Sequence, residues 1–229
     1  MVVVEVNMDD ILFEDRHDAG RQLAARISQL PYAKELPVVL GIPRGGVVVA
    51  AEVAEALSAP LDVIIARKIR APYQPELGIG AVVNGAHVTV LNEELVRMVG
   101  APKDYLDREI AYQSKEIDRR LRSYRGKRPG TEVSGKTVII VDDGIATGYT
   151  FRAALEGLRQ HKPLRLIAAA PVAARDTAKM LAAFADELIC LSTPFNFMAV
   201  GQWYRSFDQV SDEEVVAILQ RNWARENAP

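Results

Sequence analysis

Val138-Ile-Ile-Val-Asp-Asp-Gly-Ile-Ala-Thr-Gly-Tyr-Thr150 is the stretch of this sequence that decides the fold. It opens with an apolar, β-branched run that is typical of a buried strand. Two adjacent acids, Asp142 and Asp143, follow directly, and then a loop of small and hydroxyl residues leads to a helix expected to begin near Thr150. A strand that ends in acids and turns into a helix predicts an open α/β sheet, which binds ligands at this edge.

Alternating strands and helices continue the same pattern along the chain. Strands are predicted at residues 38–40, 61–65, 136–141, 164–172 and 187–191, and helices at 15–30, 47–57, 151–161 and 173–184. Strand, helix and strand in succession imply parallel pairs with right-handed crossovers. The predicted fold class is therefore α/β, with a doubly wound, mostly parallel sheet covered on both faces.

Residues 71–130 depart from this alternation and are predicted to form an insertion of loop, hairpin and helix. A loop flanked by prolines is expected first, then a hairpin of 80–83 with 87–90 closed by Asn84-Gly85, a strong turn pair, and then a polar helix over 103–124. Residues 193–229 are expected to form a small C-terminal hood and a last helix, opened by the capping box Ser211-Asp-Glu-Glu214. We expect one domain over 1–229.

Composition excludes several classes of protein. The net charge is -2, 49% of the residues are hydrophobic and 25% are charged, so no global field indicates a nucleic-acid or membrane partner. The single cysteine, Cys190, rules out a disulfide within the chain and favours a reducing compartment. Because no signal-like or membrane-length apolar run is present, we expect a cytoplasmic protein. The basic end of the 103–124 helix is interpreted as a solvated face.

Zinc and serine hydrolase chemistry have no support in the sequence. The three histidines and the cysteine lack metal-ligand spacing: His17, His87, His161 and Cys190. There is also no Gly-x-Ser-x-Gly elbow.

The stretch at 138–150 does have the groups that a sugar phosphate needs. Backbone N–H groups at a helix start carry partial positive charge, and the hydroxyls of Thr147 and Thr150 add donors for a phosphate. Asp142 and Asp143 are better used as acceptors for a neighbouring diol, since they would repel the phosphate itself. The alternative is an ordinary strand-to-helix turn with solvated acids.

This stretch resembles the signature of type I phosphoribosyltransferases, in which an apolar run precedes two acids and a Thr-Gly-x-Thr loop. The resemblance covers about residues 38–191, and the tail at 194–207 is similar to a little-characterised bacterial and archaeal branch of that family. The resemblance implies that 5-phosphoribosyl-1-pyrophosphate (PRPP) binds at Asp142, Asp143, Ala146, Thr147, Gly148, Tyr149 and Thr150.

Two further segments fit the resemblance. Gly41-Ile-Pro-Arg-Gly-Gly46 ends the first strand, where the family places a loop for the pyrophosphate; alone, it also suits a turn with a surface arginine. Arg67-Lys-Ile-Arg70 is predicted to end the second strand, followed by a closing loop between residues 71 and 80; the alternative is a basic strand end in water. The pyrophosphate is thereby assigned to Pro43, Arg44, Gly45, Arg67 and Lys68, with Lys68 favoured over Arg67.

The aromatic tail is the candidate hood over the acceptor. Phe195, Phe197, Trp203 and Tyr204 are suited to stack on a planar base, and they equally suit an ordinary core. In the hypoxanthine and guanine branch, the position of Ala146 carries an acid that interacts with the purine. Alanine has no such chemistry, which argues against a 6-oxopurine acceptor.

The resemblance implies an Mg²⁺-dependent transferase in which a nitrogen of the acceptor, expected to be a nucleobase, displaces pyrophosphate from C1 of the sugar. The catalytic candidates are Arg44, Lys68, Asp142 and Asp143, and the two acids are expected to approach Mg²⁺ through sugar hydroxyls or water. The alternative is a non-catalytic regulator that senses PRPP or a nucleotide; the intact Arg44 and Lys68 favour the enzyme. Members of the family usually form homodimers.

Overall fold

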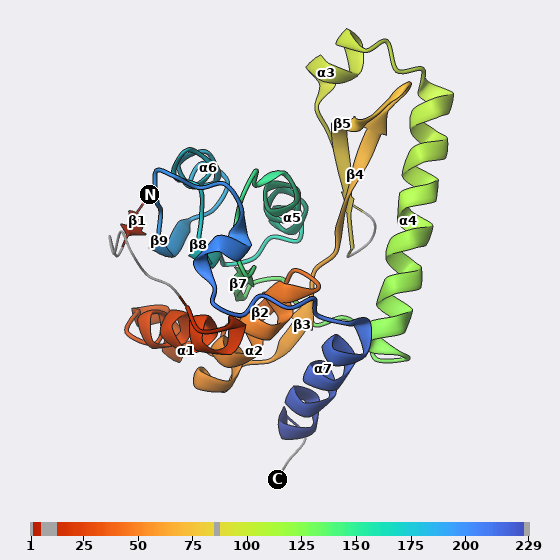
Figure 1. Cartoon of the computed structure of the whole chain (residues 1–229). Coiled ribbons are helices and arrows are strands. Elements are labelled where there is room, and N and C mark those ends of the chain that lie inside the picture. Colours follow the sequence, from red (N-terminus) through yellow and green to blue (C-terminus); the bar gives the residue numbers. More distant parts are fainter. Residues whose placement is uncertain (1, 6–12, 85–87, 227–229) are drawn as a thin grey trace.

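Six strands of the described residues form a parallel sheet in the order β1-β9-β8-β7-β2-β3 (Figure 1). The computed structural model describes residues 2–5, 13–84 and 88–226. Each neighbouring pair in this sheet is parallel, so the predicted fold class is confirmed. The strands are β1 (Val2–Glu5), β2 (Val38–Gly41), β3 (Leu61–Val63), β7 (Thr137–Val141), β8 (Arg165–Val172) and β9 (Glu187–Ser192).

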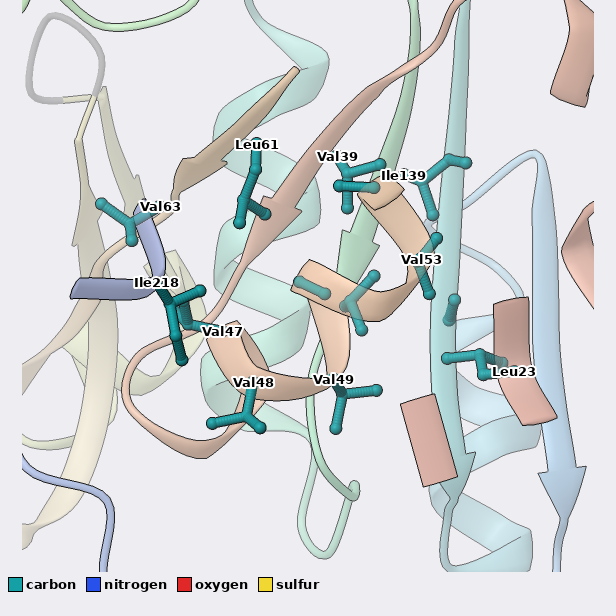
Figure 2. Close-up of a cluster of buried hydrophobic side chains, with 14 of the residues drawn as sticks. Leu23, Val39, Val47, Val48, Val49, Val53, Leu61, Val63, Ile139 and Ile218 are labelled. Carbon is teal, nitrogen blue, oxygen red and sulfur yellow. The ribbon is translucent and has the colours of Figure 1, made fainter. Parts of the chain in front are cut away.

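Helices cover both faces of this sheet. Alternate strand residues point to opposite faces: Val39 and Ile139 pack against α1 (Arg16–Ile27), α2 (Gly45–Ala56) and α7 (Asp212–Glu226), as Figure 2 shows in part. Their neighbours Leu40 and Ile140 pack instead with the helices of the other face, α5 (Tyr149–Arg159) and α6 (Arg175–Leu181). Burial on both faces explains why these strands are apolar throughout.

A separate antiparallel sheet forms an arm that projects from the body (Figure 1). It consists of β4 (Ala66–Ala71), β5 (Gln74–Val83) and β6 (Val88–Leu91), followed by α3 (Glu93–Met98) and the long α4 (Lys103–Arg125). The predicted pairing of the β5 and β6 segments is confirmed, with Val83 opposite Val88. Residues 85–87 of the predicted turn, which include Gly85 and His87, lie outside the described residues.

The start of the arm corrects two predictions. Arg67–Arg70 does not end the second parallel strand, because β3 ends at Val63 and the chain then leaves for β4. The loop expected between residues 71 and 80 is a tight hairpin, in which Ala71 pairs with Gln74 and the turn residue Tyr73 has a φ of 64°. Pro75 is tolerated within β5 because it stands beside the turn, where the register of the hairpin also shifts.

The two ends of the described chain add one unpredicted and one predicted element. The hydrophobic pattern did not predict β1, which joins the sheet as an edge strand beside β9. The last helix, α7, begins as predicted, with the Ser211 hydroxyl accepting a hydrogen bond from the backbone N–H of Glu214 at 3.1 Å. Within the described residues, no helix combines the length and the apolar character that a membrane crossing requires.

Candidate functional site

Strand β7 delivers Asp142 and Asp143 to the carboxyl edge of the parallel sheet. The backbone N–H of Asp142 still donates to the carbonyl of Ala169 on β8, at 3.3 Å. Its carboxylate then accepts a hydrogen bond from the backbone N–H of Asp143 at 2.9 Å. Both acid side chains are partly buried there. The strand end therefore fixes the two acids side by side, as the sequence predicts.

The start of α2 packs directly on this acid pair. A Cβ atom at Gly45 would lie 1.9 Å from Oδ2 of Asp143, and one at Gly46 would lie 2.8 Å from Oδ1 of Asp142. Glycine is therefore required at both positions for this approach. This approach places the first backbone N–H groups of α2, which carry partial positive charge, beside the acids. The glycine segment and the acids therefore belong to one site.

Burial raises the pKa of the Asp142 carboxyl well above its ordinary value of 3.8. The negative charge of Asp143 raises it further, while the positive charge of Arg16 opposes the shift. Ionising Asp142 is therefore costly in the free protein. A ligand that donates hydrogen bonds to the carboxylate offsets this cost.

The end of the loop that follows the acids and the start of α5 present exposed side chains. Thr147, Tyr149 and Thr150 are exposed, and Gly148 adopts a φ of 73° that favours glycine. The carbonyl of Ala146 is turned toward α6, where it accepts a hydrogen bond from the Thr177 hydroxyl at 2.6 Å. The first turn of α5 contains no acidic residue, which leaves its N–H groups available to an anion.

Arg44 stands at the N-cap of α2, beside Pro43 and Gly45. Burial and a hydrogen bond to Asp212 raise the pKa of Tyr124 to about 12, and the charge of Arg44 opposes this rise. The charge of Arg120 opposes the rise more strongly than that of Arg44 does. The backbone of Arg44 lies next to the acid pair, because Gly45 packs on Asp143.

The two basic candidates on β4 are held within the arm. Arg67 donates through Nε to Oε1 of Gln113 on α4, at 2.6 Å. Lys68 points to the other face of the strand, where its Nζ lies 3.2 Å from Oε2 of Glu76 on β5. Because Lys68 and Glu76 are both exposed, this pair holds the lysine only weakly.

The aromatic tail divides into packed and exposed rings. Phe197 and Trp203 stack on each other with centroids 6.4 Å apart and pack against the core, as the alternative interpretation expects. Tyr204 is buried, and its hydroxyl donates to the backbone carbonyl of Asp143. Phe195 remains 79% exposed, with the guanidinium of Arg175 3.5 Å from its ring centroid. Of the predicted hood residues, Phe195 offers the most open ring.

Comparison with known proteins identifies the family. The model of the phosphoribosyl transferase domain matches residues 10–202, most of the chain. This chain belongs to the phosphoribosyl transferase family. It is 47% identical over 210 residues to the Mycobacterium tuberculosis proteins named "Putative phosphoribosyl transferase" MT0597 and Rv0571c, which covers 92% of this chain and 47% of theirs. The chain thus spans about half the length of the curated relatives it matches.

A solved structure shows that the whole architecture recurs. The crystal structure of TT1426 from Thermus thermophilus is similar to this chain, with a TM-score of 0.83 and 44% sequence identity. The match covers 92% of this chain and 99% of that chain. The match leaves out too little of this chain to exclude the arm, so the arm belongs to the arrangement that both proteins share.

Sequence reasoning missed two contacts of the acid pair formed by Asp142 and Asp143. Arg16, the first residue of α1, places Nε 2.7 Å from Oδ2 of Asp143. Tyr204 was considered as a stacking residue, whereas its buried hydroxyl holds the Asp143 backbone. Burial and the charge of Asp143 raise the pKa of this hydroxyl, so it stays protonated and donates. The one weak signal in the sequence is a positive residue at the start of a helix, where the helix dipole disfavours it, and this signal does not show what the side chain contacts.

Proposed function

We propose that this domain transfers the phosphoribosyl group of PRPP to a nitrogen atom of a nucleobase and releases pyrophosphate. The contact between the acids Asp142 and Asp143 and the Gly45-Gly46 start of α2 carries this proposal. It sets acceptors for two sugar hydroxyls beside backbone donors suited to a pyrophosphate. The exposed loop that follows the acids then suits the 5-phosphate, through Thr147, Thr150 and the first N–H groups of α5.

In the proposed reaction, a bond forms between C1 of the sugar and the attacking nitrogen while the bond from C1 to the pyrophosphate oxygen breaks. The electron pair of the broken bond leaves with the pyrophosphate, and the proton on the attacking nitrogen passes to solvent. Arg44 and Lys68 neutralise the leaving group, which stabilises the charge that develops as the bond breaks. To bind the pyrophosphate, Lys68 exchanges its ion pair with Glu76 for one with the leaving group. Breaking the pair with Glu76 costs little free energy, because both side chains are exposed.

The acid pair also fits a hard cation. Two neighbouring carboxylates supply the oxygen ligands that Mg²⁺ prefers. Among the described residues, no group of three or more His, Cys, Asp or Glu side chains is placed to hold a metal ion. Asp142 and Asp143 would therefore hold Mg²⁺ through sugar hydroxyls or water, and the cation would offset the charge of the pyrophosphate.

Phe195 is the residue we assign to the acceptor base. Its ring is exposed on one side and covered by the Arg175 guanidinium on the other. Aromatic stacking accepts many heterocycles, so this ring places a planar acceptor without selecting among bases.

The test is to incubate the protein with PRPP, Mg²⁺ and each of a panel of purine and pyrimidine bases, and to measure pyrophosphate release and nucleotide formation. We expect pyrophosphate and a nucleotide in equal amounts with at least one base. Tight PRPP binding without release for any base would instead support the regulator. An absence of PRPP binding would contradict both the transferase and a regulator that senses PRPP.

A further inference from the structure

One arginine joins the acid pair to the C-terminal segment of the chain. Nε of Arg16 lies 2.7 Å from Oδ2 of Asp143, and its Nη1 donates to the backbone carbonyl of Asp208 at 2.7 Å. The guanidinium carbon lies 3.8 Å from the ring centroid of Phe207. Only 12% of the Arg16 side chain is exposed. A single planar group therefore contacts the proposed sugar site on one side and residues 207–208 on the other.

Backbone hydrogen bonds fix the same two segments together. The N–H of Phe13 donates to the carbonyl of Trp203 at 2.9 Å, and the N–H of Arg205 returns a bond to the carbonyl of Phe13 at 2.8 Å. The N–H of Ser206 donates to the carbonyl of Glu14 at 2.9 Å. The segment that leads into α1 thus forms a short ladder with residues 203–206, and Arg16 stands at its end.

The placement of Arg16 is unfavourable for the helix that contains it. Arg16 is the first residue of α1, where the partial positive charge of the helix terminus disfavours a cation. Asp15 already caps this helix, with its carboxylate accepting a hydrogen bond from the backbone N–H of Asp18 at 2.7 Å. The arginine therefore does not stabilise the helix. The contacts of the Arg16 side chain with Asp143 and residues 207–208 give the physical reason for an arginine at this position.

We propose that Arg16 is a positioning residue, which fixes the Asp143 carboxylate for the sugar and makes the sugar site depend on the seating of residues 203–208. This inference rests on the proposed function, because the sugar is the group that Asp143 is held to receive. A lysine cannot replace the arginine: its ammonium is a point charge without the planar fork that reaches Asp143 and the Asp208 carbonyl at once.

The first readout is PRPP binding, measured by calorimetry in the presence of Mg²⁺ for the wild type, Arg16→Ala and Arg16→Lys. The matched control is Arg159→Ala. Arg159 also contacts an aspartate and a backbone carbonyl, with Nη1 3.0 Å from Asp186 and Nη2 3.3 Å from the Phe184 carbonyl. It stands at the C-terminal end of α5, whereas the proposed phosphate site is at the N-terminal end. We expect Arg16→Ala and Arg16→Lys to weaken PRPP binding by roughly tenfold to a hundredfold, the scale of one charged hydrogen bond, and Arg159→Ala to leave it unchanged.

Chemical rescue separates positioning from simple loss of structure. Free guanidinium, at concentrations far below those that unfold proteins, should restore PRPP binding to Arg16→Ala, and sodium at equal ionic strength should not. PRPP binding by Arg16→Ala as tight as by the wild type would overturn the inference, as would equal weakening in Arg159→Ala. If the wild type itself binds no PRPP, the proposed function fails instead.

The second readout does not need PRPP. Hydrogen exchange at the amides of Phe13, Arg205 and Ser206 reports whether the ladder between the two segments is seated. We expect faster exchange at these amides in Arg16→Ala than in Arg159→Ala. Unchanged exchange at all three would overturn the coupling to residues 203–208, whatever the PRPP measurement gives.

Discussion

Two arginine–aspartate pairs in this molecule have the same geometry and different surroundings. Asp62 with Arg125, and Asp143 with Arg16, each have an Nε–Oδ distance of 2.7 Å. Asp62 is 2% exposed and uses both oxygens on protein donors, including the backbone N–H of Val63 and of Thr131. Among the described residues, the one charged side chain recorded as donating to the Asp143 carboxylate is Arg16, at the edge of the sheet.

The difference separates a structural pair from a functional one. The Asp62 pair borders a cavity of about 220 Å³, yet the hydrogen bonds of its carboxylate are made within the protein. A saturated acid has nothing left to offer a ligand, whereas an acid that has one donor at a strand end does. A cavity beside an acid therefore does not by itself mark a ligand site in this molecule.

The largest expected effect comes from Asp62→Asn. An amide cannot accept at both positions, so one donor would face an NH₂ group in the interior. We expect a loss of roughly 3–5 kcal/mol in the free energy of unfolding, measured in urea. Asp143→Asn should lose about 1 kcal/mol, because its carbonyl oxygen can still accept from Arg16. If Asp62→Asn and Asp143→Asn lost the same free energy of unfolding, the two pairs would not differ in their structural role.

Gly45→Ala tests the Asp143 pair from the side of α2. The new methyl group would meet Oδ2 of Asp143 at 1.9 Å and Nε of Arg16 at 2.7 Å, so the pair must move. We expect a destabilisation of roughly 1–3 kcal/mol together with weaker PRPP binding. Gly78→Ala is the control, since its Cβ has Lys68 no nearer than 3.7 Å and should change stability by less than about 0.5 kcal/mol. Normal PRPP binding by Gly45→Ala would contradict the close approach.

Asp142→Asn tests the environment of the acid pair through the pH dependence of folding stability. Because the pKa of Asp142 is raised in the folded chain, the folded state binds this proton more tightly than the unfolded state does. The stability of the wild type therefore falls as the pH rises above the ordinary value of 3.8. An amide does not titrate, so Asp142→Asn should melt at a higher temperature than the wild type at neutral pH, with the gain vanishing below pH 3.8. A lower melting temperature at neutral pH would refute this.

The smallest effect is expected for Arg205→Gln. Arg205 and Glu14 form an ion pair in which both side chains are more than half exposed. We expect urea unfolding to change by less than about 0.5 kcal/mol, since water screens such pairs. If Arg205→Gln lost as much free energy of unfolding as Asp62→Asn, solvent exposure would not explain how strongly these arginine–acid pairs stabilise the fold.

The sequence predicts the parts of the site that are local. An apolar run that ends in Asp142 and Asp143, and a glycine pair after another strand, are enough to bring both segments to one sheet edge. Arg16 could not be found in this way, because its role depends on a ladder between residues 13–14 and 203–206, which lie far apart in the chain.

The arm was also difficult to predict for a physical reason. No turn residue separates Ile64 and Ile65 from Arg67, so nothing in the pattern shows that the chain changes sheets there. The directions of Arg67 and Lys68 are set by α4 and β5, whose positions the local sequence does not contain. Their role at the pyrophosphate stays a prediction.

The central claim is that the two acids at the end of β7 hold the sugar of PRPP. Calorimetric titration with PRPP and Mg²⁺, comparing the wild type with the double variant Asp142→Asn and Asp143→Asn, tests it most directly. Asp104→Asn with Asp107→Asn, two exposed acids of α4, is the matched control. We predict that the heat of binding disappears in the first double variant and persists in the second; equally tight binding in all three proteins would contradict the account.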